Sequence, residues 1–98
     1  MADAKVTVIA RARAKAGLEE QLRQEITALI APTRAEPGCI NYDLHQSASD
    51  PALFMLHENW VSMHALEEHL AMPYLEAFKA KAPDLLAEPL DLSFWTMI

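Results

Sequence analysis

The stretch CINYDLHQSASDPALFMLHENWVSMHALEEHLA, residues 39–71, decides the fold. Residues 39–47 alternate apolar and polar side chains, a pattern that predicts a β-strand with one buried face. Ser49-Asp50-Pro51 predicts a turn, and residues 53–60 predict a second strand that pairs with the first as a hairpin. Ser62 then suits the N-cap of a helix. The stretch therefore predicts a β-hairpin followed by a helix.

The two predicted strands differ in how their faces are covered. In the first, the alternation places Ile40, Tyr42 and Leu44 on one face, with polar side chains on the other. In the second, residues 53–60, both faces are apolar over the first half. A strand of this kind is expected to be covered on both sides.

Upstream of the hairpin, the pattern predicts a strand and a helix. Residues 5–13 alternate and contain β-branched side chains, as in a strand. After Gly17, four apolar residues recur at spacings of four, four and three, which places them on one face of a helix; they are Leu18, Leu22, Ile26 and Leu29. Either Pro32 or the turn Glu36-Pro37-Gly38 is expected to end this helix.

Downstream, the helix that begins after Ser62 is expected to run to about Ala71, where Pro73 interrupts it and a second helical piece follows. Residues 90–97 predict the last strand. The order is then βαββαβ, which favours an α+β, ferredoxin-like fold with a four-stranded antiparallel sheet and both helices on one face. The whole chain, residues 1–98, is expected to form one domain.

The composition indicates an interface or a pocket in addition to the core. Of the 98 residues, 52% are hydrophobic, more than a core of this size needs. Since helices can cover only one face of the sheet, two sheets packed face to face in a homodimer would cover the other. We therefore expect a homodimer of the dimeric α+β barrel type.

Charge and cysteine content exclude several classes of function. The net charge of −6 and the absence of a basic cluster argue against a nucleic-acid partner. No apolar run approaches the roughly 20 residues that span a membrane, and residues 1–5 lack the apolar core of a signal peptide. Cys39 is the single cysteine, which fits a reducing compartment and a small buried side chain. We expect a cytoplasmic protein without a membrane partner.

The residues that could carry chemistry lie between His57 and His69. There is no glycine-rich phosphate loop and no nucleophile elbow. The histidines do not recur at metal-ligand spacing, so no metal is expected.

His69 lies at the border of the helix's apolar face, where it is either a hydrogen-bonded core residue or a general base facing a cavity. Glu58 shares a strand face with Trp60 and needs a partner if it is buried.

The stretch FMLHENWVSMHALEEHLAMPYLEAF, residues 54–78, resembles the antibiotic biosynthesis monooxygenase (ABM) family, which includes quinol monooxygenases. The segment from Glu36 to Leu44 and Gly17 also fit the family pattern. The positions that carry the resemblance in residues 54–78 are Phe54, Glu58, Trp60, Ser62, Ala65, Leu66, His69, Pro73 and Phe78.

The resemblance implies the ferredoxin-like fold, the sheet-to-sheet homodimer and a pocket between helices and sheet. It also implies oxygenation of a small aromatic quinol or phenol by O2 without a cofactor. His69 would then be the base, Trp60 a pocket wall and Glu58 a residue that tunes nearby polar groups. The expected substrate-binding residues are Tyr42, Leu66, Tyr74 and Phe78.

Departures from the pattern leave the chemistry open. Haem-degrading members carry a tryptophan and a histidine where this chain has His69 and Lys79, so haem degradation is not expected. Polyketide-tailoring members carry an asparagine where this chain has Leu56. Two alternatives stay open: a non-redox isomerase of a small polar metabolite, for which Lys79 and Lys81 are the nearby cations, and a non-catalytic ligand-binding dimer.

Overall fold

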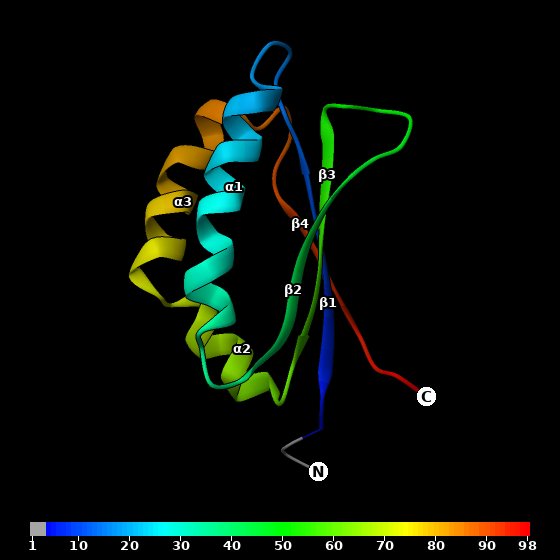
Figure 1. Ribbon diagram of the computed structural model, residues 1–98, viewed down its shortest axis with the longest axis vertical. Coiled ribbons are helices and arrows are strands. Elements are labelled where there is room, and N and C mark those ends of the chain that lie inside the picture. The colour runs from blue at the N-terminus through cyan, green and yellow to red at the C-terminus, as the bar shows by residue number, and fades with distance from the viewer. Residues whose placement is uncertain (1–3) are drawn as a thin grey trace.

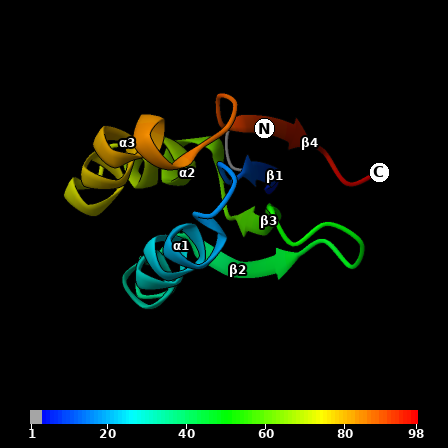
Figure 2. The ribbon, with the colours of Figure 1, turned by 90° about the horizontal axis from the view of Figure 1, so that it is seen from above.

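The computed structural model describes residues 4–98. Its elements follow the predicted order: β1 (Val6–Arg13), α1 (Glu19–Arg34), β2 (Cys39–Gln46), β3 (Leu53–Trp60), α2 (Met63–Leu70), α3 (Pro73–Leu85) and β4 (Asp91–Trp95). The strands form one antiparallel sheet in the order β2-β3-β1-β4. The helices cover one face of this sheet, with α1 and α3 side by side (Figures 1 and 2). The predicted ferredoxin-like fold is confirmed.

Helix α1 buries the face that its apolar spacing predicts. Leu22, Ile26 and Leu29 are buried against the sheet, and Glu19 lies in the first turn, where the helix dipole favours an acid. The helix continues past Pro32 and ends at Arg34. Of the two predicted ends, the Glu36-Pro37-Gly38 turn is therefore the correct one.

The β2–β3 hairpin contains an irregularity that the sequence pattern did not predict. The pairing register shifts between Cys39 and Asn41, which is the signature of a β-bulge. Because of this shift Ile40 is 52% exposed while Tyr42 is 2% exposed. The prediction that Ile40 shares the buried face of Tyr42 is wrong for that reason.

The start of β2 is held tightly against α2. Ser62 is the N-cap of α2, as predicted, and its Oγ accepts a hydrogen bond from the Ala65 backbone N–H at 3.1 Å. A Cβ added to Gly38 would overlap the Cβ of Ala65. The turn can therefore approach α2 closely only because residue 38 is glycine.

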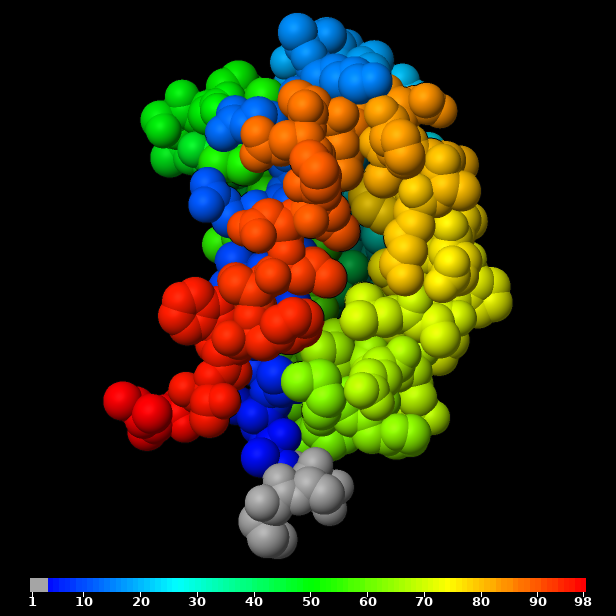
Figure 3. Space-filling model, turned by 180° about the vertical axis from the view of Figure 1, so that it is seen from behind, coloured from blue at the N-terminus to red at the C-terminus, as the bar shows by residue number. Residues whose placement is uncertain are grey.

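The hydrophobic core lies between the sheet and the helices, whereas β4 and the chain end remain uncovered. Leu92, Phe94 and Trp95 of β4 are 36%, 52% and 57% exposed. Residues 96–98 extend beyond the sheet (Figures 1 and 3). Within residues 4–98, no helix has the length and apolar character needed to cross a membrane.

Candidate active site

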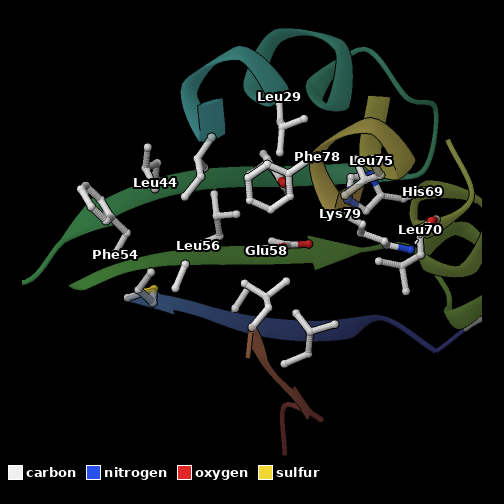
Figure 4. Close-up of a pocket in the computed structure, with 17 residues that line it drawn as sticks. Leu29, Leu44, Phe54, Leu56, Glu58, His69, Leu70, Leu75, Phe78 and Lys79 are labelled. Atoms are coloured by element: carbon white, nitrogen blue, oxygen red, sulfur yellow. Dashed lines mark hydrogen bonds between the residues drawn. The ribbon is translucent and has the colours of Figure 1, made fainter. Parts of the chain in front are cut away.

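A small cavity lies between the helices and the middle of the sheet (Figure 4). Its volume is about 60 Å³ and most of its walls are apolar side chains from β1, β2, β3, α1 and α3. The side chains that bring polar or charged atoms to these walls are Tyr42, Glu58, His69 and Lys79. An apolar cavity with a few convergent polar groups is the usual form of a ligand site.

His69 is fixed at the cavity wall by a buried carboxylate. It lies in the last turn of α2, and its Nδ1 is 2.8 Å from Oε2 of Glu36, with side-chain exposures of 2% and 7%. The Tyr74 hydroxyl also donates to Oε2 of Glu36. A carboxylate partner at Nδ1 favours the tautomer in which Nδ1 carries the proton and Nε2 is free to accept one. Burial lowers the pKa of His69, while Glu36 opposes that shift.

Two aromatic rings enclose the His69 imidazole. The Trp60 ring lies 4.5 Å away between centroids at an interplanar angle of 34°, and the Tyr42 ring lies 5.5 Å away at 67°. Trp60 is fully buried and does not line the cavity. It therefore contacts His69 without facing the space that a ligand would occupy.

Glu58 is a buried carboxyl group at the cavity wall, in the middle of β3. It has the partner that burial requires, because Trp60 Nε1 donates a hydrogen bond to Glu58 Oε1 at 3.0 Å. Burial raises the pKa of Glu58 to about 7, against the lowering effect of that hydrogen bond. The group can therefore exchange a proton near neutral pH.

Lys79 is the only lysine or arginine among the described residues that line the cavity. Its Nζ donates to the carbonyl of Leu70 at 3.0 Å, at the end of α2, and lies 3.5 Å from Glu76 Oε2. Lys81, the other candidate cation, pairs with Glu25 at 3.2 Å and does not line the cavity.

The structure brings together some of the predicted site residues and not others. Glu58, His69, Tyr42 and Phe78 line the cavity. Leu66 packs in the core and Tyr74 directs its hydroxyl to Glu36; neither lines the cavity. The roles assigned to all of these residues stay predictions.

The remaining histidines lie away from this cavity. The His64 side chain is 79% exposed beside Glu68, and His45 is exposed on β2. His57 is half-buried on β3 with its ring near Asn41. Within residues 4–98, no group of three or more His, Cys, Asp or Glu side chains is arranged to hold a metal ion.

Glu36 is the site residue that sequence reasoning missed. The sequence places it in a turn, and most acidic residues in turns are solvated. Its one distinguishing signal is that it begins the Glu36–Leu44 segment that fits the family pattern. Only the close approach of this turn to α2, at Gly38, shows that its carboxylate reaches His69.

Comparison with known proteins identifies the family. The sequence model described as "Antibiotic biosynthesis monooxygenase" matches residues 5–81. The chain belongs to the ABM family.

Relatives support this assignment over nearly the whole chain. A Mycobacterium tuberculosis protein named "Putative monooxygenase" is 40% identical over 84 residues, which are 86% of this chain and 82% of that protein. An uncharacterized Synechocystis protein is 32% identical over 94 residues; the match covers 96% of this chain and 64% of that protein's length. A crystal structure from Pseudomonas aeruginosa superposes with a TM-score of 0.93 at 35% identity, covering 100% of this chain and 98% of that one.

Proposed function

We propose that this ABM-family chain is a monooxygenase that oxidises a small aromatic quinol or phenol with O2 and without a cofactor. The names of two relatives, from Mycobacterium tuberculosis and Bacillus subtilis, support monooxygenase chemistry in general. The substrate class is our inference from the cavity, whose walls are mostly apolar and carry two proton-exchanging groups, Glu58 and His69.

The acidic net charge and single cysteine support a cytoplasmic location without a nucleic-acid partner.

The observation that carries this proposal is the Glu36–His69 pair at the cavity wall. With the Nδ1 proton of His69 directed to Glu36, Nε2 is left to take a proton from a substrate hydroxyl. The lowered pKa keeps the imidazole neutral and ready to act as a base at neutral pH. Glu36 then stabilises the imidazolium that forms, as the carboxylate does in other carboxylate–histidine pairs.

The substrate needs a base because its hydroxyl group must lose a proton before the ring reacts with O2. A quinolate or phenolate is electron-rich enough to reduce O2 itself, so no outside reductant is consumed. For a quinol, one oxygen atom forms a bond to a ring carbon and the other leaves as water, so that quinol and O2 give a hydroxyquinone and water. The departing oxygen needs protons, and Glu58, with a pKa near 7, is placed to supply one.

We also propose that the chain works as a homodimer. The support is the exposed apolar surface of β4, where Phe94 and Trp95 are more than half exposed. Exposed apolar patches on a small protein mark interaction sites. Trp95 pairs with Thr7 on the sheet face away from the helices, and a second copy packed on that face would cover it.

The test is O2 consumption by the purified, chelator-treated protein with a panel of quinols and phenols. We expect uptake that depends on the protein, and incorporation of one labelled atom from ¹⁸O2 into the product. His69→Gln should abolish most of this uptake, while His64→Gln, which changes an exposed histidine of the same helix, should not. Tight binding of quinones without uptake would instead identify a ligand-binding protein, and conversion of a sugar phosphate would identify an isomerase.

A further inference from the structure

A second, larger hollow adjoins the cavity on the side of α3. It is a groove of about 510 Å³ between the second half of α3 and the segment that leads to β4. Figure 3 shows this hollow between the orange segment before β4 and the yellow helix α3. Neither the family match nor the site described above assigns it a role.

The groove and the cavity share part of their walls. Phe78, Lys79 and Leu90 line both. Phe78 is 6% exposed and lies above Glu58 in Figure 4, so its ring stands where the two spaces meet. A ligand that entered the cavity past Phe78 would have the groove directly behind it.

The groove is chemically different from the cavity. Apart from Lys79 and Glu88, all of its lining residues are Ala, Pro, Leu or Phe. Lys79 is at the shared wall, and Glu88 pairs with Arg13 at 3.8 Å. The groove therefore has no unpaired polar side chain to recognise a polar substituent, and burial of an apolar chain is the interaction that it can offer.

Size points to the same kind of ligand. Sites for small organic ligands usually measure roughly 300–1,000 Å³. The inner cavity, at about 60 Å³, is far below this range, whereas the cavity and the groove together fall within it. The cavity can take the hydroxyl-bearing edge of a ring, and the rest of the ligand needs the groove.

We infer that the ligand is a phenol or quinol whose ring carries an apolar chain, with the hydroxyl end beside His69 and Glu58 and the chain in the groove. The placement of the hydroxyl end rests on the proposed function. The chain site stands on the geometry of the groove alone.

The test measures binding by calorimetry for 4-methyl-, 4-propyl- and 4-pentylphenol. Each added methylene should tighten binding roughly fourfold as long as the chain stays in the groove. Ala87→Trp places a large side chain in the groove, since Ala87 lines it and is exposed. In this variant 4-methylphenol should lose far less affinity than 4-pentylphenol, and the gain with chain length should disappear.

The matched control is Ala80→Trp, which changes an alanine of α3 that is also exposed and lines neither space. It should keep the full dependence on chain length. If the affinity of the native protein did not rise with chain length, the groove would not be the site of the chain. Oxidation of 4-methylphenol would still support the proposed function in that case. Heptanoate binding as tightly as 4-pentylphenol would overturn the placement of the ring. If no alkylphenol binds, the inference is wrong, and O2 uptake with the quinols of the panel still decides the proposed function.

Discussion

His69 Nδ1 and Glu36 Oε2 lie 2.8 Å apart although 33 positions separate the two residues in the chain. Both side chains are almost fully withdrawn from solvent. A buried carboxylate needs a strong partner, and a buried imidazole needs a group that fixes its tautomer. This single contact satisfies both requirements and leaves one ring nitrogen of His69 for a ligand.

Replacing His69 by Gln should lower kcat by about 10²- to 10⁴-fold, the usual contribution of a general base. The change should also lower the free energy of unfolding by about 1–3 kcal/mol, because it leaves the buried Glu36 carboxylate with a poorer partner. Steady-state O2 uptake and denaturant unfolding measure the two effects. A variant with full turnover but much lower stability would make His69 a structural core residue.

Glu36→Gln tests whether Glu36 positions His69. Since a neutral amide does not hold the imidazolium, kcat should fall, by up to about 10⁴-fold. Glu36 raises the pKa of His69, so its removal lowers that pKa. The acid limb of the kcat profile should therefore move to lower pH. Glu67→Gln, an exposed change on α2, is the control and should leave the profile unchanged.

The raised pKa of Glu58 predicts a pH-dependent loss of stability. Burial raises this pKa from 4.5 to about 7. Between these values the unfolded chain has lost the proton that the folded chain keeps, so stability falls as pH rises from about 4.5 to 7. The change is up to about 3 kcal/mol for a shift of this size.

The Glu58 effect is measured as the difference between native protein and Glu58→Gln in denaturant unfolding at pH 4.5 and pH 8. The variant should gain stability relative to the native protein across this range. His69 acts in the opposite direction, because its pKa is lowered on folding and the stability that it contributes is lost as pH falls below 6.5. Both proteins contain His69, so this contribution cancels in the difference between them. A constant difference between the two proteins would show that Glu58 titrates normally.

Gly38→Ala should push the Glu36 turn away from α2. The new Cβ would overlap that of Ala65, and overpacking of this kind costs about 1–3 kcal/mol. Ala65→Gly in the same chain removes the overlap and should recover part of this loss, less the roughly 1 kcal/mol that glycine costs in a helix. Thermal unfolding of the two single variants and the double variant measures the coupling. Strictly additive effects would contradict the contact.

The proposed homodimer predicts a mass of twice the 10.9 kDa chain in light scattering at micromolar concentration. Trp95→Asp should shift the protein toward a monomer, because it places a charge on the exposed apolar surface of β4. Met63→Asp is the matched control, since Met63 is also an exposed apolar residue, at the start of α2. A native protein that stays at 10.9 kDa would refute the dimer.

The fold was largely predictable because its periodicities are strong. The predicted strand 53–60 coincides with β3, and Ser62 caps α2 as expected. The β-bulge near Ile40 was not predictable, since one extra residue in a strand leaves no mark on composition. The last strand is shorter than predicted, Asp91–Trp95 instead of 90–97, because β4 is an edge strand that pairs only with β1.

The site was less predictable than the fold. Glu58 stands out in the sequence because it shares a strand face with Trp60, and His69 because it borders the apolar face of its helix. The structure places both at one cavity. Glu36 does not stand out, because its contact depends on how closely a turn approaches a helix. The sequence predicts that Tyr74 lies near the site, but it does not predict that the Tyr74 hydroxyl donates a hydrogen bond to Glu36.

Phe78 is both a core side chain and the shared wall of the cavity and the groove. Passage of a ligand between the two spaces therefore requires the packing around α3 to loosen for a moment, rather than a surface loop to move. Substitutions that tighten this packing should raise the melting temperature and slow ligand association together. The association rate should also rise steeply with temperature, because each entry waits for a fluctuation of the interior.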